Sequence, residues 1–178
     1  MIKLKSLSVL FFSALLFLGL SAPIQAKTVP PGGTWGTAGL GFGAKLESPI
    51  GGSDYFLMLL GGVEHSINSN FSVVGDIEWG LAGTIPFRMH AGVRVRITGL
   101  KLPLSPWLQT QLTAGVLFDA LGADLGLIGI RPGLGADYFI TSKLSTSVVI
   151  NLDIDRTLGE RPAFYGQWEF LLAANYLF

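Results

Sequence analysis

The chain of 178 residues contains no cysteine, and charged residues make up only 13% of it. The absence of cysteine excludes a lipid anchor attached to a thiol and a zinc site built from thiolates. Soluble domains carry about 25% charged residues, so this composition is hard to place on a surface that faces water. Basic and acidic residues balance at 12 each, which excludes a strongly basic nucleic-acid-binding protein.

A long apolar run occurs only near the start of the chain. Residues 1–26 are predicted to be a helical, cleavable signal peptide, with Lys3 and Lys5 ahead of an apolar stretch at 7–20 and cleavage after Ala26. That stretch is shorter than the ~20 residues of a membrane-spanning helix, which favours a signal peptide over a permanent anchor. Its removal would leave 10 basic and 12 acidic residues.

Residues 27–33 are expected to form a periplasmic N-terminal segment, followed by one domain at 34–178. No stretch of that domain has the continuous apolar run of a membrane helix, yet the mean hydropathy of the chain is +0.53, part of which belongs to the signal peptide. Inside lipid, only α-helices and closed β-barrels satisfy every backbone hydrogen bond. A membrane location for this domain therefore requires a closed barrel.

The main signal in this domain is alternation with a period of two, which is typical of a β-strand with two different faces. In 87–98 the odd positions are apolar, from Phe87 to Ile97, and the even positions include Arg88, His90 and Arg94. No helix could sort these residues in that way. The same alternation occurs in six other segments, at 35–47, 71–81, 107–119, 126–139, 144–155 and 164–178.

An eighth segment, 55–65, is apolar at both odd and even positions, so its facing is undetermined. Counting it gives the even number of strands that a single-chain bacterial barrel requires. The sequence therefore predicts an all-β fold, an eight-stranded antiparallel up-and-down transmembrane barrel. Pro132 cannot donate a ladder hydrogen bond, which predicts a bulge or a local break there.

The connections alternate between short turns and longer loops. Periplasmic turns are expected at 69–70 and 141–143, with a Pro-containing periplasmic connection at 99–106. Outer loops are expected near four short segments, at 48–54, 81–86, 119–124 and 156–162. Loops of this length leave little material for a large external binding head.

A soluble, lipocalin-like barrel shares this periodicity, since alternation does not say which face is inside. Glycines interrupt the polar face, for example Gly41 and Gly133, and small inward residues suit a narrow eight-stranded lumen. Aromatic residues near strand ends are typical of the two girdles of membrane barrels. They are Trp35, Trp79, Phe87, Trp107, Phe118, Tyr138, Phe164, Trp168, Tyr176 and Phe178. Together with the low charge, these features favour the membrane barrel.

The last strand ends in Phe178, with Tyr176 two residues earlier. This ending resembles the signal that the outer-membrane assembly machinery reads, although Ala173 and Ala174 stand near the place of the usual glycine. In size and layout, 34–178 is similar to the OmpA-type and OmpX-type small barrels. The resemblance implies an outer-membrane location, insertion by the barrel assembly machinery, contact with outer-membrane lipid and a monomeric state. It supplies no active site.

The predicted inward face carries charges of both signs. If 71–81 and 87–98 form a hairpin, Glu78 lies opposite Arg88 and Asp76 opposite His90. Such residues form either a salt-bridged plug, which we favour, or a polar passage for ions and small solutes. The expected lumen network comprises Asp76, Glu78, Arg88, His90, Arg94, Arg96, Arg131, Asp137, Asp153, Asp155 and Glu169.

Enzymatic chemistry has little support in the sequence. A lipid A acyl hydrolase would need Ser, His and an acid together at the outer lipid boundary. Only His65 and His90 are available; no serine is evident beside His90, and His65 lies on the periplasmic side. No metal-ligand spacing and no cofactor motif occurs. We therefore expect a non-enzymatic barrel without a cofactor, with a structural or interaction role.

Overall fold

The computed structural model describes residues 29–47, 55–81, 85–100, 104–118, 125–159 and 162–178. The predicted signal peptide and the expected loops at 48–54 and 119–124 lie outside these ranges. Eight strands are formed: β1(Thr34–Glu47), β2(Tyr55–Ser66), β3(Phe71–Gly80), β4(Ile85–Arg96), β5(Leu104–Phe118), β6(Leu125–Phe139), β7(Leu144–Leu158) and β8(Phe164–Leu177). In the described ranges no helix is long and apolar enough to cross a membrane.

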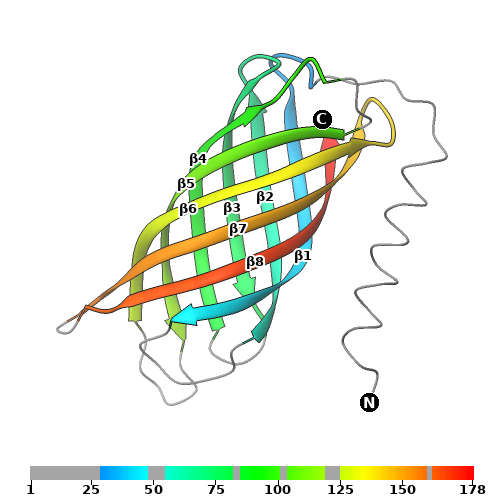
Figure 1. Cartoon of the computed structure of the whole chain (residues 1–178). Helices are drawn as coiled ribbons and strands as arrows, with labels where there is room; N and C mark the ends of the chain where they lie inside the picture. The colour runs from blue at the N-terminus through cyan, green and yellow to red at the C-terminus, as the bar shows by residue number, and fades with distance from the viewer. Residues whose placement is uncertain (1–28, 48–54, 82–84, 101–103, 119–124, 160–161) are drawn as a thin grey trace, which may run out of the picture.

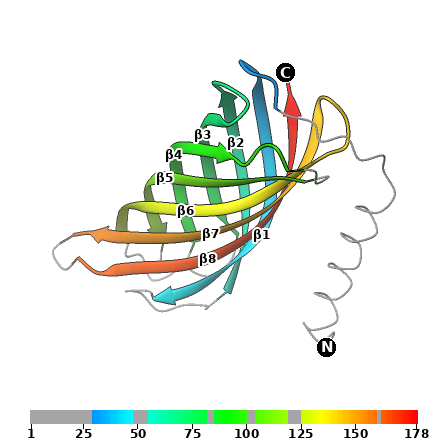
Figure 2. The same ribbon diagram turned by 45° about the horizontal axis from the view of Figure 1, so that its top comes forward.

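The strands form one closed barrel in chain order, and each is antiparallel to both neighbours (Figures 1 and 2). Closure occurs where β1 pairs with β8, from Trp35 opposite Leu177 to Glu47 opposite Gly166. The predicted eight-stranded up-and-down barrel is therefore confirmed. We call the end where β1 begins and β8 ends the proximal end, and the opposite end the distal end.

The pairing of two prolines bears on earlier expectations: that of Pro132 refines one, and that of Pro106 corrects another. Pairing between β6 and β7 lapses at Arg131 and Pro132 and resumes at Gly133 in the same register, so Pro132 causes a local break and no bulge. Pro106 was expected in a connection, but β5 begins at Leu104 and Pro106 pairs with Ala136. The carbonyl of Pro106 accepts a hydrogen bond from Ile97 N, just after β4, at 2.9 Å. Pro106 therefore still bonds to that neighbouring chain segment although it has no N–H to donate.

The barrel is polar inside and apolar outside, which confirms the facing predicted from the alternation. Large hydrophobic side chains of every strand are exposed on the outer surface, among them Leu40, Leu57, Ile77, Met89, Leu112, Ile128, Ile154 and Phe170. The residues of opposite parity are buried inside. In β2, whose facing the sequence left open, Phe56, Met58 and Glu64 point inward.

The prediction that Trp35 and Trp107 belong to the aromatic girdles is wrong. Trp35 and Trp107 are 3% and 1% exposed and lie inside the barrel. Both occupy positions of inward parity in their strands, and parity outweighs nearness to a strand end because a residue cannot change face without a register shift. The indole of Trp107 donates to Asp137 at 2.9 Å, which satisfies its N–H inside the barrel. Trp79, Phe118, Phe164, Trp168, Tyr176 and Phe178 are exposed outward.

Candidate functional site: the polar lumen

All eleven residues of the expected network point into the barrel, and ten of them are buried, with Asp76 half-buried. Nine of them form two ionic groups, while Asp76 lies 3.7 Å from Arg131 and His90 lies 3.5 Å from Glu78. The distal cluster comprises Glu78, Arg88, Arg131, Asp153, Asp155 and Glu169. The proximal cluster comprises Arg94, Arg96 and Asp137, together with Glu64, which the sequence analysis did not select.

In the distal cluster, two guanidinium groups hold four carboxylates. Arg88 lies 3.0 Å from Glu78 across the β3–β4 pair and 3.1 Å from Asp155. Arg131 donates through Nε to Glu169 Oε2 at 3.0 Å and also lies within 3.8 Å of Asp153. Every one of these side chains is fully buried. Because buried charges are tolerated only when paired, these residues depend on one another.

The proximal cluster is balanced, with two guanidinium groups and two carboxylates. Glu64 accepts from Arg94 at 2.6 Å and from Arg96 through its other oxygen. Arg96 also lies 3.2 Å from Asp137. The guanidinium of Arg94 is 3.8 Å from the ring centre of Trp107, a cation–π contact that adds to the ion pairs.

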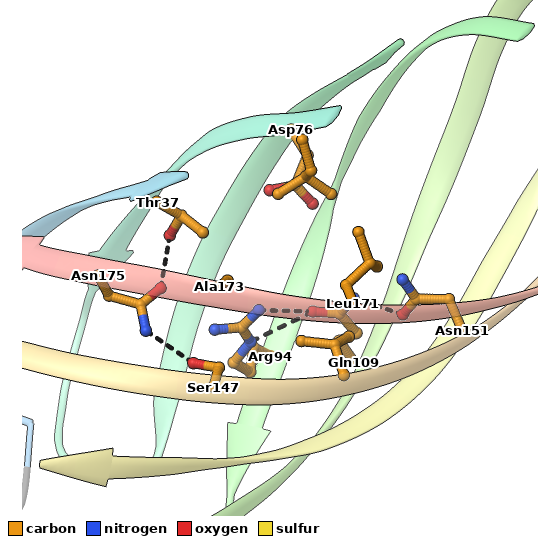
Figure 3. A pocket seen from close by; sticks show the side chains of 11 residues that line it. Thr37, Asp76, Arg94, Gln109, Ser147, Asn151, Leu171, Ala173 and Asn175 are labelled. Atoms are coloured by element: carbon orange, nitrogen blue, oxygen red, sulfur yellow. Dashed lines mark hydrogen bonds between the residues drawn. The ribbon is translucent and has the colours of Figure 1, made fainter. Parts of the chain in front are cut away.

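Side-chain amides connect the two clusters, ending with Asn151, which donates to Glu169 of the distal cluster at 3.1 Å. Figure 3 shows a small cavity lined by Arg94, Gln109 and Asn151. Thr37 and Asp76 also line this cavity. Arg94 donates to Gln109 at 2.8 Å, and Gln109 donates to Asn151 at 3.1 Å. The cavity has a volume of about 20 Å³, close to the space that one water molecule occupies.

His90 has partners that the sequence analysis did not identify. In β4 it lies opposite Asp76 in register, but its ring contacts Thr113 Oγ1 at 3.0 Å through Nδ1 and Glu78 at 3.5 Å through Nε2. A hydroxyl, an imidazole and a carboxylate are the components of a hydrolytic triad. Here all three side chains are buried in the lumen, and none of them lines either of the two cavities found in the part of the chain that the structure describes.

Three carboxylates of the distal cluster, Glu78, Asp153 and Glu169, place oxygens within 4.8 Å of one another. Oxygen ligands at such distances are what a hard cation requires. The guanidinium groups of Arg88 and Arg131 contact the same carboxylates and supply two positive charges there. His65 lies on the outer surface, hydrogen-bonded to Thr34 at 3.0 Å, and takes no part in the lumen.

Several lumen residues were missed for identifiable reasons. The alternation places Gln109, Gln111, Asn151 and Gln167 on the polar face, but these neutral residues are absent from the expected network of charged residues. Gln111 donates to Asp76 at 2.5 Å, and Gln167 donates to Asp153 at 3.3 Å. Glu64 was missed because its strand is apolar at both parities. The charge of Glu64 is the signal in the sequence that could have identified it. If a charged Glu64 points into the lumen, the other even positions of β2 must point inward as well.

Comparison with known proteins gives a likeness in structure alone. No family model and no curated protein matches the chain. Neisserial surface protein A has a TM-score of 0.64 at 14% identity, over 82% of this chain and 97% of that one. The N-terminal barrel domain of Pseudomonas aeruginosa OprF has 0.60 at 10% identity, over 82% and 99%. Pseudomonas aeruginosa OprG has 0.59 at 12% identity, over 85% and 98%.

At these identities the likeness concerns the fold. It confirms, at that level, the resemblance to small OmpA-type barrels that the strand pattern indicates. The strand order, the closure between β1 and β8 and the polar lumen agree with it. The chain therefore has the fold of the small eight-stranded outer-membrane β-barrels.

Proposed function

We propose that this chain is a non-enzymatic integral protein of the bacterial outer membrane, with a structural or interaction role and a lumen occluded by its own side chains. The observation that carries the proposal is the distribution of polarity: ionic side chains are buried inside, and large apolar side chains are exposed outside. In water this arrangement would be unfavourable, because extended apolar surface is costly to hydrate. In a bilayer the same surface contacts hydrocarbon.

The dimensions of the strands support a spanning barrel. They are 10 to 15 residues long, and a tilted membrane strand needs about 9–11 residues. Exposed aromatic residues lie toward both ends, such as Trp79 and Phe164 near the distal end and Tyr176 near the proximal end. Amphipathic rings in such positions are typical of the lipid–water boundaries. We expect the barrel assembly machinery to insert the chain, which then works as a monomer.

The contents of the lumen support occlusion. Arg88, Arg131 and Glu169 occupy the interior with no exposure to solvent, and the small cavity beside Arg94 has the volume of a single water molecule. A solute path would require a continuous space along the axis. The same burial separates His90 from any lipid substrate, which supports a non-enzymatic role.

Cell fractionation tests the location. We expect the protein to stay with the outer membrane until detergent is added, and to begin at Lys27 on N-terminal sequencing. On gels it should migrate differently before and after boiling, because a folded barrel resists unfolding by the detergent. Recovery in the aqueous periplasmic fraction without detergent would instead favour the soluble, lipocalin-like alternative.

Planar-bilayer recording tests the occlusion. The purified barrel should give no conductance above the background of the bilayer. A current that Arg94→Ala alters would assign an ion path to the lumen and replace the occluded model. Release of fatty acid from lipid A, abolished by His90→Ala, would replace it with an enzyme.

A further inference from the structure

Residues 29–33 precede β1 and form a defined structure at the proximal end, which we call the N-terminal latch. Its sequence is Val-Pro-Pro-Gly-Gly. Gly33 N donates to Pro30 O at 3.2 Å, and Gly32 has a φ of 74°. Proline at the second position and glycine with positive φ at the third are the signature of a type II turn. The sequence of this segment therefore reverses the chain just before the barrel begins.

Backbone hydrogen bonds hold the latch against the end of β2. Gly32 N donates to Ser66 O at 2.7 Å, and Ser66 N donates to Gly33 O at 2.9 Å. The other side of the latch packs on β8, because a Cβ at Gly33 would lie 2.9 Å from Leu177 Cδ1. The turn is thus fixed to two strands that lie on either side of β1.

The reversal carries Val29 back over the opening of the barrel. Val29 is only 1% exposed, although it belongs to no strand. It lines a recess with Trp35, Phe139 and Ser145, and the ionic residues Arg96 and Asp137 lie on the same recess. Trp35 and Phe139 pack edge to face, with ring centres 6.0 Å apart. Apolar side chains therefore cover the end of the proximal cluster.

We propose that the N-terminal latch closes the proximal end of the lumen and keeps the ion pairs of Glu64, Arg96 and Asp137 away from solvent. Burial strengthens these ion pairs, because water would screen them and compete for their hydrogen bonds. The latch depends on the side chain of Val29 for the seal and on the turn for its position. This inference does not depend on the membrane location, since the closure can be measured in detergent.

A single introduced cysteine measures the closure directly, because the chain has none of its own. Ser145→Cys places a thiol in the recess beneath Val29, at a residue that is 2% exposed. The full-length, detergent-solubilised protein is treated with a small cationic methanethiosulfonate reagent, and the labelling rate is measured with and without Val29→Gly. Val63→Gly is the matched control, because Val63 lies on the outer surface and does not line the recess.

We expect Ser145→Cys to react slowly while Val29 is present and about tenfold faster with Val29→Gly, which corresponds to about 1.4 kcal/mol of latch stability. Val63→Gly should leave the rate unchanged. Thr157→Cys, buried at the distal end, should react at the same slow rate in all backgrounds, which shows that the barrel itself is intact.

Equal labelling rates of Ser145→Cys with and without Val29→Gly would overturn the proposal. Fast labelling while Val29 is present would overturn it as well. If Val29→Gly also accelerates the labelling of Thr157→Cys, the milder Val29→Ala takes its place and the same comparison decides.

Discussion

Phe56 on β2 occupies the space that a side chain at Gly43 on β1 would need. A Cβ built on Gly43 would lie 2.6 Å from Phe56 Cε1, and the two residues are direct partners in the β1–β2 register. Phe56 belongs to one buried cluster with Met58, Trp107 and Leu171, so a shift of its ring would disturb a packed interior. Gly43 of β1 thus makes room for the inward side chains of Phe56 and Met58 on β2.

Gly43→Ala should destabilise the barrel by about 1–3 kcal/mol, the usual cost of overpacking a filled interior. Urea unfolding in lipid vesicles, followed by tryptophan fluorescence, measures the loss. Gly61→Ala is the matched control, because nothing lies within 4 Å of a Cβ built there. A greater loss for Gly61→Ala than for Gly43→Ala would contradict this account of the interior.

Arginine on the outer surface should be costly at the middle of the barrel and tolerated at its rim. Leu112 is 70% exposed near the middle of β5, and Leu158 is exposed at the distal end of β7. In a bilayer, Leu112→Arg should cost about 2–4 kcal/mol and Leu158→Arg about 0–1 kcal/mol. Unfolding of the two variants in vesicles gives the difference. A barrel whose surface faces water would show no such dependence on depth.

Removing a guanidinium from the distal cluster should harm the protein more than removing a carboxylate. The cluster holds four carboxylates against two guanidinium groups. Arg131→Met leaves several buried carboxylates without their partner and should cost about 3–5 kcal/mol. Asp153→Asn keeps the shape and can still accept from Gln167, so we expect a change of about 1 kcal/mol or less. The same unfolding measurement compares them, and the reverse order would refute the charge argument.

Phe178→Ala should reduce assembly into the membrane while leaving export intact. The Phe178 ring is exposed, packs edge to face against Tyr176 at 5.6 Å and covers Gly36. We expect this aromatic pair to serve recognition by the assembly machinery, because it resembles barrel insertion signals. Phe164→Ala removes an exposed ring from the opposite end of β8 and serves as the control. The heat-shifted band in the membrane fraction should fall for Phe178→Ala alone, and similar amounts for both variants would argue against recognition at this position.

The sequence determined the number of strands, their order and the facing of seven of them. Alternation in segments such as 87–98 records a difference between the outer surface and the lumen at every second residue, and this signal is local. It also predicted that Glu78 faces Arg88, because a short connection between adjacent strands fixes the register within narrow limits.

The tertiary structure decided what alternation cannot encode. In β2 both parities are apolar, so alternation leaves the facing of Phe56 open, and in the folded barrel Phe56 points inward against Gly43 of β1. Arg131 and Glu169 lie on β6 and β8, which do not pair, and they meet because the barrel is narrow enough for side chains to reach across it. Val29 became buried for a similar reason, since closure of β1 on β8 creates the recess that it fills. A period of two specifies whether a side chain points into the lumen or to the outer surface. Closure of the barrel specifies which residues of other strands it meets.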